Sequence, residues 1–250
     1  MEWWKEYFDE DYFKIYGFRE EQTQQEVRFI EDVLALAKGN EVLDLCCGHG
    51  WHAVELAERG YAVTGLDLSE YYLKIAEERA EQAGVRIRFI HSDMRETPFE
   101  EAFDAVINLF TSFGYFEKEE DNARALEAVS RSLKPNGKLL IDLVNREWVV
   151  KMRPWQRWCE AEGNLVLEKS FGFDVFTGRF NSKKILISDE GRKDLAFSVR
   201  AYSYVEFSKM MEDVGLKVIG AFGGYDRSDY GINSRRMILL AQKKGQNSVD

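Results

Sequence analysis

The chain has 250 residues, 45% of them hydrophobic and 31% charged, a balance typical of one α/β domain with an elaboration and not of a disordered chain. The net charge of -10 argues against nucleic acid or a membrane surface as a partner, because polyanions select for basic faces. No run approaches the ~20 apolar residues of a membrane span, and the acidic, aromatic N-terminus lacks a signal-peptide pattern, so we expect a cytoplasmic protein.

Two amphipathic helices are predicted at the start of the chain. Residues 3–16 are rich in Trp, Tyr and Phe, and residues 20–37 place their apolar side chains on one helical face. Gly39 follows the second pattern and can end that helix. We therefore expect residues 1–40 to form a helical lid or cap.

The next hundred residues alternate between short apolar strands and helices. The predicted strands are 41–45, 62–66, 86–90, 105–109 and 138–143, and the predicted helices are 51–59, 70–83 and 117–133. Ser69 fits the N-cap of the second helix, and the Lys-Pro-Asn-Gly sequence at 134–137 predicts a turn. Strands joined by helices favour right-handed βαβ units, so residues 41–145 predict a Rossmann-like, doubly wound, mostly parallel sheet.

After residue 145 the pattern changes to longer strands with hairpin signals, which predicts an antiparallel β insertion over residues 146–203. Its three predicted strands are 164–174, 179–187 and 194–203, with turns at 176–178 and 189–191. The α/β core then resumes over residues 204–243, with a predicted helix at 205–214 and predicted strands at 216–221 and 237–242. Residues 244–250 form a tail.

Cysteine and histidine usage indicates neither disulfides nor a metal site. Cys46, Cys47 and Cys159 are too few for a disulfide framework, and adjacent cysteines rarely bridge without strain. His49 and His52 lack any further ligand motif with zinc spacing. We therefore predict no metal.

A glycine-rich loop follows the first predicted strand. In an open α/β sheet, ligands bind outside the carboxyl ends of the strands, and this loop lies at such an end. Gly48 and Gly50 would let the backbone turn tightly and approach a ligand closely. The same spacing also fits a dinucleotide-binding loop, so the glycines alone discriminate weakly.

Three aspartates distinguish between the candidate ligands. A carboxylate at Asp44, just before the glycines, would repel a pyrophosphate but attract an ammonium group. Asp67 ends the second strand and can bind both hydroxyls of a ribose. Asp93 ends the third strand and suits the exocyclic amine of adenine, with Leu68 and Met94 as apolar walls. Ammonium, ribose and adenine together describe S-adenosylmethionine (SAM).

Residues 41–145 resemble the class I SAM-dependent methyltransferases. Five motifs of that family occur in order, at residues 44–50, 65–69, 92–94, 103–108 and 133–140. The sheet of this family ends in an antiparallel hairpin, so the resemblance implies that the two C-terminal strands pair antiparallel. Two positions depart from the family pattern: Cys46 replaces the usual first glycine, and Trp51 stands where small or polar residues are common.

The resemblance also implies the cofactor and its contacts. SAM would be converted to S-adenosylhomocysteine, and Asn108 would lie near the sulfonium. The ribose would be held by Asp67, beside Leu68, and the adenine by Asp93 and Met94. The methionine part would be held by the loop that contains Asp44, Cys47, Gly48 and Gly50.

The stretch from Asn108 to Phe116 resembles a branch of small-molecule methyltransferases that includes sugar and amine N-methyltransferases. Members of this branch often have an aromatic N-terminal helix and a β insertion, which this chain matches. We therefore expect methyl transfer to a small-molecule acceptor by in-line displacement, with the insertion on the substrate side. Tyr115 and Tyr16 are the candidate catalytic residues. The sequence leaves a homodimer as one possible oligomeric state.

Three other functions remain as alternatives. An NAD(P)-dependent oxidoreductase could use the same glycine loop but would not need Asp44 or Asp93. A non-catalytic SAM-binding protein would keep the cofactor loops without an acceptor pocket. A protein or RNA methyltransferase would use the insertion for docking. The sequence after Asn108 lacks the Pro-Pro-aromatic motif of enzymes that methylate amino groups of DNA.

Overall fold

The computed structural model describes residues 2–10, 20–161, 163–189 and 191–245. Its main sheet has seven strands in the order β10-β11-β5-β4-β1-β2-β3. Neighbouring strands among the five on the β3 side pair in parallel. These five are β1 (Glu41–Leu45), β2 (Ala62–Asp67), β3 (Arg88–His91), β4 (Phe103–Asn108) and β5 (Leu133–Val144).

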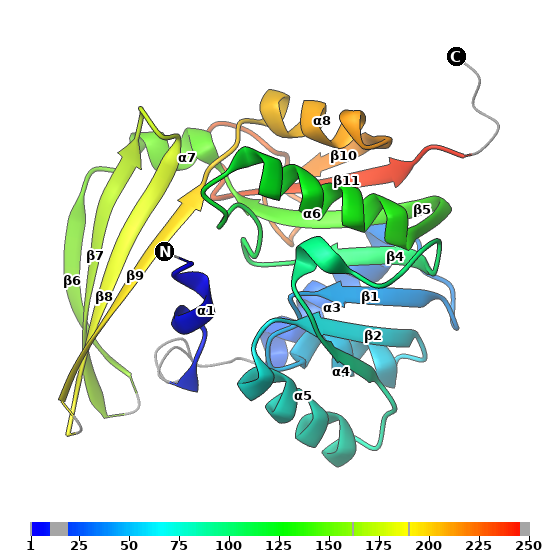
Figure 1. Ribbon diagram of the computed structural model, residues 1–250, viewed down its shortest axis with the longest axis horizontal. Coiled ribbons are helices and arrows are strands. Elements are labelled where there is room, and N and C mark those ends of the chain that lie inside the picture. Colours follow the sequence, from blue (N-terminus) through cyan, green and yellow to red (C-terminus); the bar gives the residue numbers. More distant parts are fainter. Residues whose placement is uncertain (1, 11–19, 162, 190, 246–250) are drawn as a thin grey trace.

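Helices cover both faces of this sheet (Figure 1). On one face, apolar side chains of α3 (Glu20–Leu34) and α4 (Trp51–Glu58) form a core with β1 and β4, and α5 (Glu70–Gln82) packs beside α4. On the other face, α6 (Glu119–Ser132) and α8 (Tyr204–Asp213) form a second core. The packing of helices on both faces explains why β1 and β4 are each buried at four consecutive positions and do not alternate between buried and exposed residues.

The sheet ends in two antiparallel strands, β10 (Leu216–Phe222) and β11 (Arg236–Lys243). β11 runs antiparallel both to β10 and to β5, which confirms the C-terminal strand pair implied by the family resemblance. The predicted fold class, a doubly wound and mostly parallel sheet with an antiparallel β insertion, is also confirmed.

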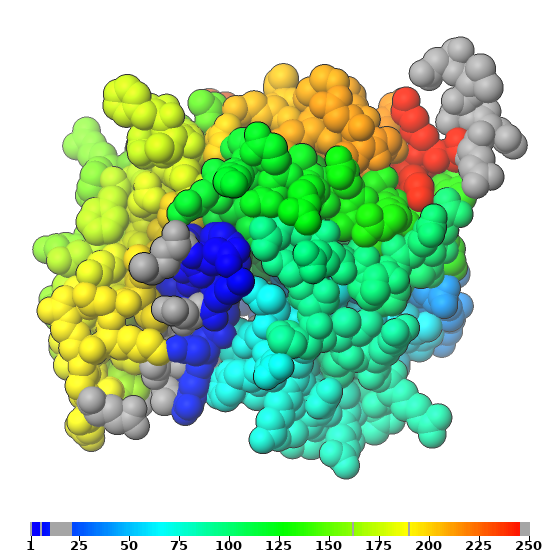
Figure 2. Space-filling view, viewed as in Figure 1, coloured from blue at the N-terminus to red at the C-terminus, as the bar shows by residue number. Residues whose placement is uncertain are grey.

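A second sheet stands beside the carboxyl ends of the parallel strands, with α1 (Trp4–Tyr7) between the two sheets (Figure 1). Its order is β6-β7-β8-β9, and all three pairings are antiparallel. The N-terminal segment fills the space between this sheet and the core on the face seen in Figure 2. Its strands are β6 (Trp155–Ala161), β7 (Asn164–Asp174), β8 (Arg179–Ser188) and β9 (Gly191–Arg200).

Two local predictions in the α/β core are wrong. Residues 134–137 lie inside β5 and do not form a turn between two elements, because the pairing with β4 jumps from Phe103↔Leu133 to Ala105↔Lys138. The Pro and Asn-Gly signals therefore mark a bulge within a strand. The helix predicted to reach residue 37 ends at Leu34, because Ala35 has a left-handed φ of 53°.

The insertion differs from its prediction in number of elements. It contains α7 (Arg146–Lys151) and β6 in addition to the three predicted strands, and the strand predicted at 194–203 is β9. β6 escapes pattern analysis because it is an edge strand that is mostly exposed and so lacks an alternating burial pattern. The helix predicted over 3–16 is wrong in length: α1 ends at Tyr7, because Phe8 leaves the helical conformation with a ψ of 71°. Residues 11–19 lie outside the described residues.

Membrane crossing by a helix finds no support in the described parts of the chain. None of the helices in residues 2–10, 20–161, 163–189 and 191–245 is both long and apolar enough to span a bilayer.

We predict that Ser203→Ala destabilises the protein by about 1 kcal/mol. Ser203 is the N-cap of α8 and forms a capping box. Its hydroxyl oxygen accepts a hydrogen bond from the Glu206 amide, and the Glu206 carboxylate accepts one from the Ser203 amide. Urea unfolding of the variant measures this loss.

Ser208→Ala is the matched control in the same helix. Its buried hydroxyl has no hydrogen-bond partner among the described residues, so its removal should leave stability unchanged or slightly higher. Equal losses in the two variants would contradict the capping role.

Candidate active site

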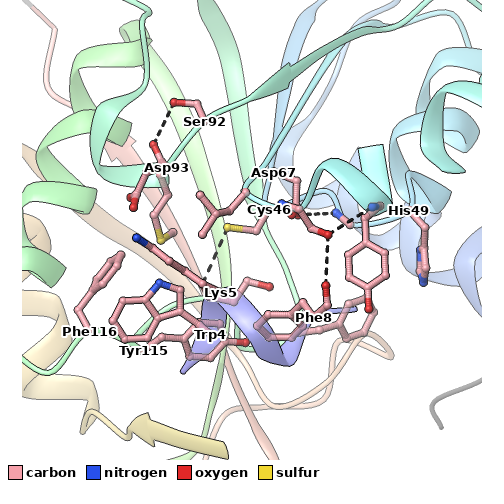
Figure 3. A pocket seen from close by; sticks show the side chains of 17 residues that line it. Trp4, Lys5, Phe8, Cys46, His49, Asp67, Ser92, Asp93, Tyr115 and Phe116 are labelled. Carbon is pink, nitrogen blue, oxygen red and sulfur yellow. Dashed lines mark hydrogen bonds between the residues drawn. The ribbon is translucent and has the colours of Figure 1, made fainter. Parts of the chain in front are cut away.

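A cavity of about 190 Å³ opens at the carboxyl ends of β1, β2, β3 and β4. The loops that follow β1, β2 and β3 form its floor, and α1 with the segment after β4 forms its opposite wall (Figure 3). The lining residues are Trp4, Lys5, Phe8, Cys46, Gly48, His49, Asp67, Leu68, Ser69, Tyr72, Ser92, Asp93, Met94, Phe110, Ser112, Tyr115 and Phe116.

The two glycines of the first loop have different surroundings. Both have left-handed backbones, with φ of 52° at Gly48 and 78° at Gly50. A Cβ at Gly48 would meet no described atom within 4 Å, so a ligand has room to approach this backbone. A Cβ at Gly50 would lie 2.7 Å from Cβ of Ala76 in α5, so Gly50 serves the packing of α5 against the loop.

Asp67 joins the first loop to the end of β2. Its Oδ2 accepts a hydrogen bond from the Gly48 amide at 2.8 Å, and its Oδ1 accepts one from the Ser69 amide at 2.9 Å. Burial raises the pKa of Asp67, and these backbone amides oppose that shift. Each carboxylate oxygen keeps a second lone pair, so Asp67 can still accept hydrogen bonds from ligand hydroxyls.

Asp93 is fixed by its neighbour Arg95 in a fork. Oδ1 accepts hydrogen bonds from Nε of Arg95 at 3.0 Å and from its amide at 2.9 Å, and Oδ2 accepts one from a guanidinium nitrogen at 2.7 Å. Burial alone would raise the pKa of Asp93, but Arg95 outweighs it and the pKa is lowered. The carboxylate is therefore ionised and oriented at the rim of the cavity.

Burial shifts the pKa values of Asp44 and His49 in opposite directions. Asp44 lies beneath the first loop, 3% exposed, and burial raises its pKa to about 7 despite the nearby His52. Burial, reinforced by the charge of Arg79, lowers the pKa of His49 to about 4, so this cavity residue is neutral at pH 7.

Aromatic side chains from distant parts of the sequence form the wall opposite the aspartates (Figure 3). The ring of Trp4 meets Phe116 edge-on with centroids 5.2 Å apart, and Phe8 stacks with Tyr115 at 5.6 Å. Phe197 of β9 lies 5.8 Å from the Tyr115 ring and so connects this wall to the second sheet. These rings present a mainly apolar wall to the floor of the cavity.

The structure divides the residues predicted from the sequence into two groups. Gly48, Asp67, Leu68, Asp93, Met94 and Tyr115 line the cavity. Asp44, Cys47, Gly50 and Asn108 do not line it and lie in or beneath the loops. Asn108 is 1% exposed and donates a hydrogen bond to the Leu45 carbonyl at 2.9 Å. Tyr16 lies outside the described residues.

Sequence analysis did not assign several lining residues. Phe110 and Ser112 follow β4 just as Asp67 ends β2 and Asp93 follows β3, so the rule that ligands bind at the carboxyl ends of strands could have found them. Lys5 comes from α1, and no local pattern connects it to the strand ends. No three His, Cys, Asp or Glu side chains gather as a metal site within the described ranges.

Comparison with known proteins places these features in context. A family model described as a methyltransferase domain matches residues 42–137. The glycine/sarcosine N-methyltransferase of Parasynechococcus marenigrum (strain WH8102) is 31% identical over 216 residues, which cover 84% of this chain and 73% of that protein.

Solved structures share the fold. This chain is similar to an S-adenosylmethionine-dependent methyltransferase from Clostridium acetobutylicum, with a TM-score of 0.80 at 18% identity over 94% of this chain and 97% of that one. It is also similar to CalS10, an amino pentose methyltransferase from Micromonospora echinaspora solved with SAM bound. That TM-score is 0.67 at 21% identity, over 94% and 95% of the two chains.

We predict that Gly50→Ala destabilises the protein more than Gly48→Ala. Both variants place alanine in a left-handed conformation, at a cost of about 1–2 kcal/mol. Gly50→Ala adds an overlap with Ala76 that costs roughly 1–3 kcal/mol more. Thermal unfolding of both variants without ligand tests this order, and equal melting temperatures would contradict it.

We predict that Asp44 makes the ligand-free protein less stable as the pH rises from about 4 to about 7. Its folded pKa, about 7, lies above its ordinary value of 3.8, so in this window the folded state binds more protons than the unfolded state. The penalty grows by roughly 1.4 kcal/mol per pH unit within the window.

Asp44→Asn removes this titration. Urea unfolding at pH 4.5 and pH 7.5 should therefore show the variant gaining stability relative to the wild type at the higher pH. A constant difference between the two proteins at both pH values would rule out the raised pKa.

Proposed function

Because this chain belongs to the class I SAM-dependent methyltransferases, we propose that it transfers the methyl group of SAM to a small-molecule acceptor. One observation carries the proposal: the cavity combines fixed polar groups at the strand ends with an aromatic wall that faces them. A cavity of about 190 Å³ suits a small acceptor, whereas a polypeptide or RNA needs a long groove. The related glycine/sarcosine N-methyltransferase acts on small amines by its name.

The lining residues fit the parts of SAM. Gly48 offers open backbone for the methionine part, and Asp67 keeps lone pairs for the ribose hydroxyls. Asp93, oriented by Arg95, can accept from the adenine amine, with Leu68 and Met94 as walls.

The remaining predicted cofactor residues support the loops from beneath. Asp44 lies under the first loop and is ionised most readily when a cation such as the SAM ammonium is near, because an opposite charge lowers a raised pKa. Asn108 ties β4 to the end of β1 through the Leu45 carbonyl. Cys47 donates its amide to the Leu66 carbonyl at 3.0 Å and so fixes the loop against β2.

When bound, SAM supplies a methyl group that is already activated by its sulfonium leaving group. The protein therefore has to align the acceptor and exclude water, and alignment alone can supply on the order of 7–11 kcal/mol. The aromatic wall of Trp4, Phe8 and Tyr115 excludes water from the floor. Tyr115 also brings a phenol to the cavity and remains our candidate for contact with the acceptor. An amine acceptor needs no general base if it arrives neutral.

Several predictions from the sequence stay predictions. The lid role of residues 1–40, the substrate-side role of residues 146–203, a cytoplasmic location and a homodimer belong here, as does the catalytic role of Tyr16. The position of α1 against the cavity is consistent with a lid.

We predict that the cofactor-free protein binds SAM and S-adenosylhomocysteine with micromolar affinity, about -8 kcal/mol, and does not bind NADH. Asp67→Ala should weaken the affinity for both SAM and S-adenosylhomocysteine at least tenfold, because it removes the only described carboxylate that ties the first loop to β2. Calorimetric titration measures all of these affinities.

Asp104→Ala is the matched control. Asp104 lies at the opposite end of β4, where it accepts bonds from the Glu41 amide and Lys134. Its loss should leave the affinities unchanged. NADH binding, or a wild-type protein that binds neither sulfur ligand, would overturn the cofactor assignment.

A turnover assay tests the acceptor class. Release of S-adenosylhomocysteine is measured with amino acids, amino sugars and small phenols in one set, and with peptides and RNA in another. Turnover with a member of the first set supports the proposal, and amines are tried first. Turnover confined to peptides or RNA would contradict a small-molecule acceptor.

A further inference from the structure

The segment after β4 carries backbone strain at the wall of the cavity. Phe110 and Thr111 both have left-handed backbones, with φ of 55° and 61°, and Phe110 and Ser112 line the cavity. Bulky and β-branched residues rarely adopt this conformation, and such strain persists only when the surrounding structure holds it. The contacts that hold these two residues therefore set the shape of this wall.

Asp142 of β5 holds both strained residues. Its Oδ2 accepts a hydrogen bond from the Phe110 amide at 3.0 Å, and its main-chain oxygen accepts one from the Thr111 amide at 2.8 Å. The register that pairs Asn108 with Ile141 places Asp142 beside the start of this turn. Asp142 is fully buried and does not line the cavity, so its contact with the site runs through Phe110 and Thr111.

Two further side chains brace the Asp142 carboxylate. The Tyr225 hydroxyl donates to Oδ2 at 2.9 Å, and a guanidinium nitrogen of Arg236 lies 2.5 Å from the same oxygen. Burial, with the nearby charge of Asp142, raises the pKa of Tyr225 well above its usual value, so its hydroxyl stays protonated and can donate. Arg236 compensates the buried negative charge.

The Phe110 ring is held by the same cluster. The guanidinium of Arg236 lies 5.0 Å from the ring centroid, and the Tyr225 ring lies 5.9 Å from it. The imidazole of His52, itself 2.9 Å from buried Glu26, lies 5.4 Å from the ring. Main chain and side chain of Phe110 are thus both fixed by residues outside the cavity.

We propose that Asp142, braced by Tyr225 and Arg236, is a positioning residue that holds Phe110 and Thr111 in their strained turn and so presets one wall of the cofactor cavity. The effect on ligand binding rests on the proposed function, because it assumes that SAM occupies this cavity. The effect on the turn rests on the hydrogen bonds alone.

The test compares Asp142→Ala with Asp142→Asn and with Asp104→Ala, which removes a carboxylate from the other end of the neighbouring strand β4. Amide hydrogen exchange of Phe110 and Thr111, relative to that of Val42 and Leu43 in β1, is measured by NMR without ligand. The affinity for S-adenosylhomocysteine is measured by calorimetry at a temperature where each variant is folded.

We expect Asp142→Ala to speed exchange of the Phe110 amide, which loses its carboxylate partner, and to weaken S-adenosylhomocysteine binding, each about tenfold. The Thr111 amide keeps its partner, because the main-chain oxygen of residue 142 remains. Asp142→Asn keeps an uncharged acceptor, so it should show a smaller loss of about threefold, and it carries the test if the alanine variant does not fold. Asp104→Ala should change neither quantity by more than twofold.

A second substitution separates positioning from general stability. Thr111→Gly in the Asp142→Ala protein replaces a strained residue by one that adopts the left-handed conformation freely, so it should restore at least threefold of the lost affinity. Thr111→Gly alone is the reference against which the affinity gained in the double variant is measured.

Unchanged exchange of the Phe110 amide, or unchanged affinity in the folded Asp142 variants, would overturn the positioning role. So would a double variant no better than Asp142→Ala. If the wild-type protein binds no S-adenosylhomocysteine, the proposed function is what fails, and the exchange comparison still decides whether Asp142 holds the turn.

Discussion

The parallel pairing of β1 with β2 and β4 is the constraint on which the candidate site depends. It brings the carboxyl ends of these strands to one edge of the sheet, so that loops far apart in the sequence surround one cavity. The bond from the Gly48 amide to Asp67 joins two of these loops directly. It also stabilises the carboxylate that burial disfavours, so one contact both shapes the loop and keeps an acceptor in place.

Beneath the cavity lies a layer of three buried polar residues, Asp44, Asn108 and Asp142, on the neighbouring strands β1, β4 and β5. None of them lines the cavity. Asn108 donates a hydrogen bond to the Leu45 carbonyl at the end of β1, and Asp142 accepts hydrogen bonds from the turn after β4. Buried polar groups are costly unless they are hydrogen-bonded, so these contacts stabilise both the buried layer and the backbone beside the cavity.

The opposite wall has a different origin. Trp4 and Phe8 come from the N-terminal segment, Tyr115 from the segment after β4, and Phe197 from the second sheet. These rings meet edge-on or stacked, which combines large apolar burial with little polar surface. A methyltransferase that relies on aligning the acceptor with the methyl group and on excluding water needs such a wall. Here three separate parts of the chain form it.

The sequence by itself determined the parallel core and the cofactor class, because both follow from local patterns. Apolar runs between helices marked β1, β2 and β4 closely, and Asp67 and Asp93 stand at strand ends that any parallel sheet gathers at one edge. The tertiary structure decided which residues face the cavity. Asp44 is the penultimate residue of β1 and Asp67 is the last residue of β2, but only Asp67 lines the cavity, because Asp44 is buried under the loop. Three features depend on contacts between distant residues, which no local pattern encodes. They are the edge strand β6, the contribution of α1 to the cavity wall, and the hydrogen bond between Asp142 and Phe110.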